Sequence, residues 1–395
     1  MKVNTARKID YWVGIPVCFL LSCFHKIQTL AKPGGPAVKC LPKKILFMEF
    51  SEMGSAILAF ASISEVRQSY ADASLYFWIF KKNKESVNLL NIIPEKNVLT
   101  LRDDNLFLLC IDILRNLRFL RKEKIDVALD MELFSRFSSI LSFLTGAKTR
   151  VGFYKYSMEG LYRGDLHTHK VMYNPYIHIS ENFLSLVNAI ACDPDRIPLL
   201  KKKVVPNNYG LPKISFGSTE GTLSRLGPAA KTGKRIVINL GINEKIDIRK
   251  WPEGFYLELI KKILEDPQNL VILAGVGECG SDFVPHERCI NLIGKTSLKG
   301  LIGLFNCCDV LISHDSGIIH IASLTDIYII ALFGPETPQL YAPLTGNLSV
   351  FYSNFACSPC LSAYNHKNYI CKNNECLKDI SVGSVYSELK KVIVR

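Results

Sequence analysis

The stretch DVLISHDSGIIH, residues 309–320, contains the pattern that decides the fold of this chain. Its first part, Asp309 to Ser313, is a short apolar run typical of a buried strand, and a helical pattern follows from Gly317 to Leu324. A strand that leads through a small polar loop into a helix is the repeating unit of a doubly wound α/β domain. Ligands of such sheets bind at the carboxyl ends of the strands, so Asp315-Ser316-Gly317 is a candidate binding loop.

The same alternation extends outward from this stretch in both directions. In the second half of the chain we expect strands at 235–240, 269–274, 309–313 and 328–333, and helices at 252–264, 298–307, 317–324 and from 382 onward. In the first half we expect a turn at 51–55, strands at 44–50, 75–80, 97–100 and 125–130, and helices at 56–70, 106–124 and 135–144. The alternation predicts two Rossmann-like doubly wound domains, with the active site in the cleft between them.

Composition agrees with two folded domains. The chain has 395 residues, 48% hydrophobic and 21% charged, which is typical of globular proteins. We expect a first domain over 43–205, a linker rich in Pro, Gly, Ser and Asn over 206–234, and a second domain over 235–395. The formal net charge of +12 favours a membrane surface or phosphorylated substrates over nucleic acid, because no nucleic-acid-binding signature is present.

The N-terminal segment, residues 1–42, carries the membrane signal. Its run from Tyr11 to Phe24 is uncharged, but 14 residues are few for crossing a bilayer, and Pro16 predicts a kink. Tyr11 and Trp12 resemble interfacial anchors, and no clean signal-peptide cleavage site follows directly after the run. We expect a re-entrant or in-plane anchor on the cytoplasmic leaflet. The alternative is a buried helix that packs on the protein itself.

The loops after the expected strands of the second domain indicate nucleoside diphosphate binding. Backbone N–H groups around Gly317, at the start of a helix, suit a pyrophosphate. Lys250 offers a compact positive charge for phosphate, and Glu278 offers an acceptor for ribose hydroxyls. The candidate donor-binding residues are Asn239, Gly241, Lys250, Gly275, Glu278, Thr296, Asp315, Ser316, Gly317 and His320.

Six spaced motifs occur in a fixed order and carry a family resemblance over roughly residues 43–395. They are Lys250-Trp251-Pro252, Gly275-x-Gly277-Glu278, Gly294-Lys295-Thr296-Ser297, Asp315-Ser316-Gly317-x-x-His320, Leu332-Phe333-Gly334-Pro335 and Cys357-Ser358-Pro359-Cys360. In this order they closely resemble glycosyltransferase family 9, which includes the lipopolysaccharide heptosyltransferases.

The resemblance implies a GT-B fold and inverting, metal-independent transfer of a heptose or similar sugar from an ADP-linked donor, with no required cofactor. It implies that the second domain binds the nucleotide sugar and that the first binds a lipid-linked or core-oligosaccharide acceptor. It places the enzyme in lipopolysaccharide or surface polysaccharide synthesis, peripheral or monotopic on the cytoplasmic face of the inner membrane. Lys250 would stabilise the leaving diphosphate.

The chain departs from the family at the expected base. The family's first loop usually ends in Gly-Asp, whereas this chain has Gly54-Ser55. Glu52 in the same loop is the first substitute for the base that deprotonates the acceptor hydroxyl, Glu132 is the second, and Asp165 is a weaker third. Each of Glu52 and Glu132 is equally compatible with a structural role, at a helix start or in an exposed loop.

Ser55, Arg136 and Arg150 are the candidate acceptor-binding residues. Arg150 belongs to a family-like Arg150-Val151-Gly152-Phe153 element, where a basic side chain suits an anionic acceptor. A surface ion pair is the alternative. The histidines at 167, 169 and 178 lack metal-ligand spacing, and we interpret them as ordinary polar residues.

The 13 cysteines are of two kinds. Cys110, Cys192 and the pair Cys307-Cys308 lie in apolar runs, which indicates reduced, buried thiols of a cytoplasmic protein. A C-terminal group has spacing that suits a structural zinc site, with a reduced or disulfide-linked loop as the alternative; it consists of Cys357, Cys360, Cys371 and Cys376.

A rival interpretation comes from the missing carboxylate at Ser55. The chain would then be a catalytically silent GT-B relative that binds nucleotide sugar or glycan and scaffolds a membrane assembly. The intact motifs of the second domain favour the enzyme.

Overall fold

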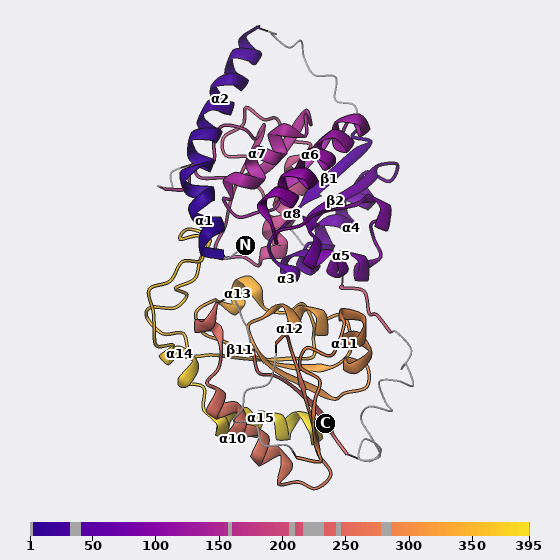
Figure 1. The fold of residues 1–395 in the computed structure, drawn as a ribbon, viewed down its shortest axis with the longest axis vertical. Helices are drawn as coiled ribbons and strands as arrows, with labels where there is room; N and C mark the ends of the chain where they lie inside the picture. The colour runs from indigo at the N-terminus through magenta and orange to yellow at the C-terminus, as the bar shows by residue number, and fades with distance from the viewer. Residues whose placement is uncertain are drawn as a thin grey trace. The chain divides into compact units, whose positions relative to one another are not determined.

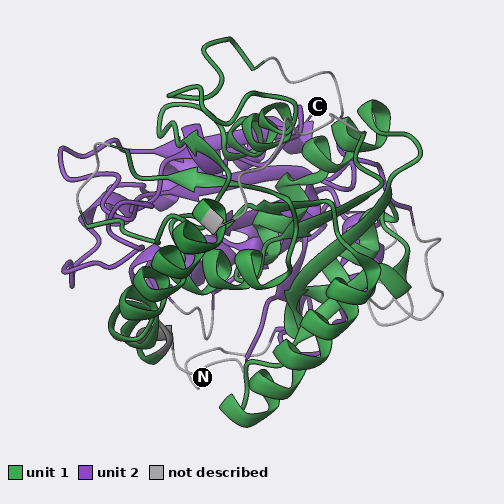
Figure 2. Cartoon of the chain, turned by 90° about the horizontal axis from the view of Figure 1, so that it is seen from above, with its two compact units in different colours: residues 1–209 green, residues 210–395 purple. Residues whose placement is uncertain are grey.

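The computed structural model describes residues 3–31, 41–156, 160–204, 210–215, 233–241, 246–277 and 286–394. The chain divides into two compact units, Met1–Tyr209 (unit 1) and Gly210–Arg395 (unit 2), which Figure 2 colours separately. Each unit contains a six-stranded parallel sheet with helices packed against it (Figure 1). The expected class, two doubly wound α/β units, is confirmed.

Unit 1 has the strand order β3-β2-β1-β4-β5-β6. Its order reverses between β1 and β4, so the carboxyl ends of these two strands form the switch point where ligands bind in such sheets. The strands are β1 (Lys44–Met48), β2 (Ser74–Phe80), β3 (Val98–Leu101), β4 (Val127–Asp130), β5 (Thr149–Tyr154) and β6 (His169–Met172).

The helices of unit 1 cover both faces of this sheet. Helices α6 and α7 share one apolar cluster with the sheet, formed around Trp78 and Leu46, whereas α4 contacts α8. Single 3-10 turns lie at Lys81–Asn83 and Glu95–Asn97. The α-helices are α1 (Val3–Trp12), α2 (Gly14–Ala31), α3 (Met53–Leu58), α4 (Phe60–Ser69), α5 (Lys84–Leu90), α6 (Leu106–Glu123), α7 (Arg136–Leu144) and α8 (Ile179–Ala189).

Unit 2 repeats the arrangement with the order β12-β11-β10-β7-β8-β9. The strands are β7 (Arg235–Asn239), β8 (Leu270–Ala274), β9 (Cys289–Asn291), β10 (Val310–His314), β11 (Tyr328–Phe333) and β12 (Leu348–Tyr352). The helices are η4 (Asp247–Arg249), α10 (Glu253–Leu264), α11 (Leu298–Phe305), α12 (Gly317–Ala322), α13 (Pro338–Tyr341), α14 (Glu375–Lys378) and α15 (Val382–Val394).

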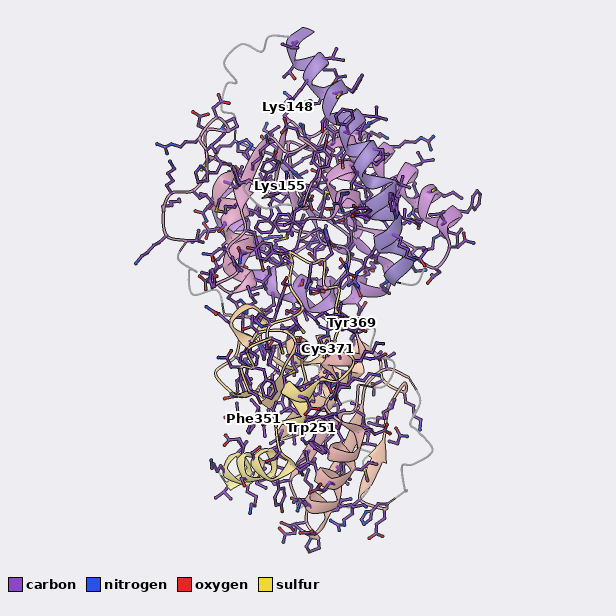
Figure 3. The ribbon with its side chains drawn as sticks, turned by 90° about the vertical axis from the view of Figure 1, so that its left-hand side faces the viewer. Lys148, Lys155, Trp251, Phe351, Tyr369 and Cys371 are labelled. Carbon is purple, nitrogen blue, oxygen red and sulfur yellow. The ribbon has the colours of Figure 1, made fainter. Side chains whose placement is uncertain are left out.

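Trp251, labelled in Figure 3, belongs to the apolar core of unit 2, which also includes residues of α14 and α15. Its ring stands edge-on to the Tyr256 ring, with the ring centroids 4.8 Å apart. Its Nε1 donates to the Ile380 carbonyl oxygen at 3.0 Å. The Lys-Trp-Pro segment is therefore anchored to residues near the C-terminus.

Two local expectations are wrong. Residues 51–55 do not form only a turn, because α3 begins at Met53 and buries Gly54 and Ser55 in its first turn. The apolar N-terminal run is also longer than expected, because α2 extends to Ala31. Pro16, expected to kink the run, lies in the first turn of α2, and the helical stretch is interrupted three residues earlier, at Val13. Among the described residues one helical stretch, Arg7–Leu30, is long and apolar enough to cross a membrane, by length and composition alone.

Candidate functional site

In unit 2, Asn239 connects the ends of two neighbouring strands. It is the last residue of β7, and its Nδ2 donates to Ser313 Oγ and to Ser316 Oγ, both at 3.0 Å. Its Oδ1 accepts from the Gly241 N–H at 3.1 Å. The structure thus brings together Asn239, Gly241 and Ser316, three of the residues that the sequence nominates for donor binding.

Two glycines allow the loops to approach this cluster closely. A Cβ at Gly275, whose φ is +136°, would lie 2.8 Å from Asn239 Oδ1. A Cβ at Gly241, with φ +67°, would lie 2.1 Å from the ring of the buried His314. Only glycine satisfies both the backbone angle and the space at these positions.

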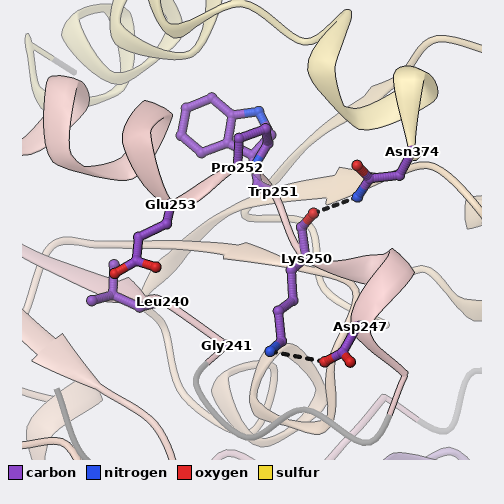
Figure 4. Close-up of a pocket in the computed structure, with 8 residues that line it drawn as sticks. All are labelled: Leu240, Gly241, Asp247, Lys250, Trp251, Pro252, Glu253 and Asn374. Atoms are coloured by element: carbon purple, nitrogen blue, oxygen red, sulfur yellow. Dashed lines mark hydrogen bonds and ion pairs between the residues drawn. The ribbon is translucent and has the colours of Figure 1, made fainter. Parts of the chain in front are cut away.

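Lys250 lies in a cavity of about 390 Å³ that opens beside this cluster (Figure 4). Its ammonium group lies 3.0 Å from Asp247 Oδ1. The other lining residues are Leu240, Gly241, Trp251, Pro252, Glu253 and Asn374.

Asn374 holds the backbone that carries Lys250. Its Nδ2 donates to the carbonyl oxygens of Ile248, at 2.9 Å, and Lys250, at 2.7 Å. Sequence reasoning missed Asn374, because it lies 124 residues after Lys250 and its only sequence signal is a position inside the cysteine-rich segment.

Arg249 is a second cation that sequence reasoning missed. Its Nη1 lies 3.4 Å from Asp315 Oδ2, and Asp315 is buried at the end of β10. The η4 turn therefore presents two neighbouring cations, Arg249 toward Asp315 and Lys250 toward the cavity, and links the Lys250 loop to the Asp315-Ser316-Gly317 loop.

The remaining nominated residues of unit 2 are less tightly grouped. Thr296 is half-buried in a loop that the Gly294 N–H ties to the Gly275 carbonyl oxygen at 2.9 Å. His320 is buried within α12, which begins at Gly317. Glu278 lies outside the described residues.

In unit 1, three carboxylates gather where β1 meets α3. The Glu132 Oε1 atom accepts from the Phe50 N–H at 2.7 Å, the Ser51 N–H at 2.9 Å and the Ser51 hydroxyl at 2.6 Å. Burial raises the pKa of Glu132, against the hydrogen bond from the Ser51 hydroxyl. Its carboxylate thus holds the loop after β1 in place.

Glu52 is the N-cap residue of α3, and its Oε2 accepts from the Ser55 hydroxyl at 3.2 Å. Glu49, which was expected within the strand, follows β1, is buried, and accepts from the Glu52 N–H at 3.3 Å. Sequence reasoning missed Glu49 as a site residue, although a lone charge at the end of an apolar strand signals one. The structure thus brings Glu52, Ser55 and Glu132 to one end of the sheet.

Next to them lies a buried ionic network. Asp130, the last residue of β4, pairs with Arg163 and accepts from the Ser138 hydroxyl at 3.0 Å. Burial alone would raise the pKa of Asp130, but the Arg163 charge and the hydrogen bond with His167 outweigh it and lower the pKa. This network underlies the Glu132 loop, because Arg163 also donates to the Glu132 carbonyl oxygen at 3.2 Å.

Arg136 and Arg150, nominated for the acceptor, are both buried and engaged inside unit 1. Arg136 pairs with Asp10 of α1 at 3.1 Å and donates to the Gly160 carbonyl oxygen at 3.3 Å. Arg150 donates to the carbonyl oxygens of Leu166 and Ala147, and burial lowers its pKa to about 10. Their role in acceptor binding stays a prediction; the contacts show both holding structure together.

The cysteine-rich segment packs on the Lys250 side of unit 2. Leu361 forms an apolar cluster with Ile246 and Ile248, against which Cys360 and Cys371 pack. Burial, followed by the nearby charges of Cys360 and Cys357, raises the pKa of Cys376 to about 11.

The geometry does not support a zinc site there. In the described part of the chain, no three His, Cys, Asp or Glu side chains are arranged to hold a metal ion, and these four cysteines are unlinked thiols. Spacing alone suggested zinc, whereas metal binding requires all the sulfur atoms to converge on one point. Cys110, expected to be buried, is exposed on α6.

Comparison with known proteins adds a family and a fold. The family model described as glycosyltransferase family 9 (heptosyltransferase) matches residues 113–370. Lipooligosaccharide heptosyltransferase 2 of Campylobacter jejuni subsp. jejuni serotype O:6 is 28% identical over 173 residues, which are 41% of this chain and 52% of that protein. The chain thus spans about half the length of this relative.

Lipopolysaccharide core heptosyltransferase OpsX of Haemophilus influenzae is 25% identical over 332 residues, 79% of this chain and 86% of that protein. The solved structure of the Escherichia coli ADP-heptose lipopolysaccharide heptosyltransferase II superimposes with a TM-score of 0.66 at 18% identity, covering 89% of this chain and 98% of that one. The similarity confirms the expected GT-B type of fold.

Proposed function

This chain belongs to glycosyltransferase family 9, and from that premise we propose that it transfers a heptose or similar sugar from a nucleoside diphosphate donor, ADP-linked, to a glycan acceptor. The observation that carries the proposal is the cavity of unit 2, in which Lys250 lies beside the polar strand ends of β7 and β10. A relative whose name specifies ADP-heptose and a relative that acts on the lipopolysaccharide core support this donor and this acceptor class.

The donor diphosphate would bind with its charge against Lys250. An ammonium group on a flexible stem offers a compact positive charge, and it counters the negative charge that develops on the leaving diphosphate. In the structure Asp247 is its partner at 3.0 Å, so binding would exchange this exposed carboxylate for phosphate oxygens. The family resemblance implies inverting transfer without a metal. In such a reaction, cationic side chains of the protein would stabilise the negative charge of the leaving diphosphate.

Asn239, Gly241, Gly275 and Ser316 would shape the rest of the donor site. Their hydrogen bonds and close backbone approach rigidify the strand ends before the donor arrives. A preorganised polar site loses little free energy in reorganising during the reaction. Thr296, His320, Asp315, Gly317 and Glu278 remain proposed members of this site.

Glu52 is the base that we propose, with Glu132 positioning it. Three donors of the loop after β1 occupy Glu132 Oε1, whereas Glu52 lies half-buried at the start of α3, with Oε2 accepting from the hydroxyl of Ser55, the position of the family's Asp. A general base must lie within hydrogen-bond reach of the acceptor hydroxyl whose proton it takes. Ser55 would then orient Glu52 and lie at the acceptor site.

We place the reaction at the cytoplasmic face of the inner membrane, in lipopolysaccharide or surface polysaccharide synthesis. The acceptor of such a pathway is lipid-linked, and the basic chain with its apolar N-terminal helix suits a membrane surface.

Calorimetric titration of the purified chain with ADP, UDP and GDP tests the donor site. We expect selective ADP binding that weakens about tenfold or more in Lys250→Ala, because a charge-assisted contact to phosphate is lost. Lys262→Ala, a lysine on the exposed side of α10, is the matched control and should bind as the unaltered chain does. If a folded sample binds none of the three nucleotides, the donor-site proposal is wrong and the scaffold interpretation takes its place.

A further inference from the structure

Helices α1 and α2 pack against the rest of unit 1, and the residues that make this contact form one stripe along the helices. The residues that face the protein recur every three or four positions, as on one side of a helix; they are Asp10, Gly14, Cys18, Ser22 and His25. The two helices follow each other directly at Val13, where the Val13 and Val17 N–H groups donate to the carbonyl oxygens of Ile9 and Val13.

Polar contacts fix this stripe to α7 and the neighbouring loop. Asp10 pairs with Arg136 at 3.1 Å, and its other oxygen accepts from the Phe137 N–H at 2.8 Å, in the first turn of α7. Farther along, the Asp165 N–H donates to Ser22 Oγ at 2.7 Å. His25 Nε2 lies 3.3 Å from the Arg150 guanidinium.

Two glycines permit close packing on both sides of this contact. A Cβ at Gly14 of α2 would lie 2.8 Å from Arg136 Cβ. A Cβ at Gly164 of the facing loop, whose φ is +76°, would lie 2.9 Å from Ser22 Oγ and 3.0 Å from Cys18 Cβ. Both contacting surfaces therefore carry a glycine where a larger side chain would prevent the close approach.

The opposite side of the same helices is apolar and exposed. Trp12 is 73% exposed, Leu20 is 65% exposed and Leu30 is 83% exposed, with Phe19 and Ile27 between them. Only 17% of the most apolar window is buried. A contiguous face of this kind indicates a binding surface.

Charge around this face favours an anionic partner. Asp10 is the only acidic residue among the first 31, and it is engaged inward with Arg136. Lys8 and Lys26 are exposed on the helices, and exposed Lys148 with half-buried Lys155 lie on the side of unit 1 that Figure 3 presents. Basic residues bordering an apolar helix face are typical of helices that bind anionic lipid.

We propose that α1 and α2 stay docked on unit 1 and lie in the plane of an anionic phospholipid bilayer, with Trp12, Phe19, Leu20, Ile27 and Leu30 in the lipid. A spanning orientation would require the stripe to leave unit 1. It would separate Asp10 from Arg136, a pair in which the Arg136 side chain is 2% exposed, and stranding a buried charge is strongly unfavourable. This inference is independent of the proposed activity.

Tryptophan fluorescence offers a direct test, because Trp78 and Trp251 are buried and only Trp12 can meet lipid. The full chain is mixed with phosphatidylglycerol-containing vesicles whose acyl chains are brominated either near the head group or near the bilayer centre. One sample is the unaltered chain, and the other carries Phe19→Trp with Trp12→Phe. In-plane binding predicts that both are quenched more by the shallow bromines.

Two outcomes overturn the proposal. One is stronger quenching of the Phe19→Trp sample by the central bromines, because position 19 is the middle of a spanning Arg7–Leu30 helix. The other is no quenching of either sample and no flotation with the vesicles.

Vesicle flotation with matched variants tests the face itself. The double variant Phe19→Ser with Leu20→Ser should lower vesicle affinity about tenfold or more, since large apolar surface no longer enters lipid. Ile370→Ser, at an apolar residue 99% exposed in unit 2, should leave affinity unchanged. Equal affinity of the double variant and the unaltered chain would contradict the proposal. ADP titration of the same samples reports separately on the donor site.

Discussion

His167 Nε2 lies 3.1 Å from Asp130 Oδ2, and both side chains are fully enclosed in unit 1. Burial, followed by the Arg163 charge, lowers the pKa of His167 to about 4. Its Nδ1 has no hydrogen-bond partner among the described residues, which fits a neutral ring that donates from Nε2 to Asp130. A Cβ at Gly152 would lie 2.5 Å from His167 Nε2, which explains the glycine of the Arg150-Val151-Gly152-Phe153 element.

This relationship predicts that unit 1 loses stability as the pH falls from about 6.5 to 4. In that window the unfolded chain protonates His167 while the folded chain does not, so protons favour unfolding, by about 3 kcal/mol over the whole window. The lowered pKa of Asp130 acts in the same direction at lower pH, because its contribution is lost as the pH falls through its folded pKa. Urea unfolding at pH 7 and pH 5 measures the loss.

The controls for this pH effect are two histidine variants. His167→Gln should flatten the pH dependence, whereas His286→Gln, at an exposed histidine, should retain it. An unchanged slope in His167→Gln would exclude this histidine as the cause.

Asn374→Ala should weaken ADP binding although Asn374 need not touch the nucleotide. It removes both hydrogen bonds that hold the backbone at Ile248 and Lys250, so the Lys250 ammonium group is less well placed. We expect a Kd for ADP raised about tenfold. Asn373→Ala, whose side chain contacts Glu375 and Lys378 at the surface, is the control and should leave the Kd unchanged. An unaltered Kd in both variants would show that the loop keeps its position without Asn374.

Glu52→Gln should lower kcat about 100-fold or more with ADP binding unchanged, because it removes the proposed base but leaves unit 2 intact. Adding Ser55→Asp should restore part of the rate. Ser55 Oγ lies 3.2 Å from Glu52 Oε2, so a carboxylate at position 55 would be near the place of the lost one. Single-turnover rates with an ADP-sugar and acceptor compare the Glu52→Gln variant and the double variant with the unaltered chain. Full activity of Glu52→Gln would contradict the assignment of Glu52 as the base.

Glu132→Ala should destabilise unit 1 by about 3 kcal/mol, since it leaves the N–H groups of Phe50 and Ser51 and the Ser51 hydroxyl without their acceptor. Glu132→Gln keeps an oxygen acceptor and should cost less. Thermal unfolding of the two variants measures the difference. If Glu132→Gln abolished turnover while remaining as stable as the unaltered chain, Glu132 would be the base instead of its support.

Much of the fold could be predicted because strands such as β2 and β8 are unbroken apolar runs of central parallel strands. The strands β5 and β6 were missed because Arg150 and His169 interrupt their patterns, and both side chains find partners only in the folded unit. The start of α3 at Met53 was missed because Ser51-Glu52-Met53-Gly54 has turn composition.

The residues of the candidate site likewise include some that could be predicted from the sequence and some that could not. Asp315 could be nominated because it follows a strand, and Lys250 because it opens a helix, each in a recognisable motif. Arg249 and Asn374 could not, because their contacts depend on tertiary approach across 66 and 124 residues. Arg136 was nominated by its charge, and only the structure reveals Asp10, 126 residues earlier, as its partner.

The bond between Asn374 and the Lys250 backbone also orders events during biosynthesis. A ribosome that has translated β7 to α10 has made Lys250, but the two residues that secure its segment, Asn374 and Ile380, come more than a hundred residues later. Domains generally fold as units as they emerge. In a nascent chain that does not yet include Asn374, the Lys250 segment therefore lacks these contacts, and on the proposed function such a chain would not yet bind the donor.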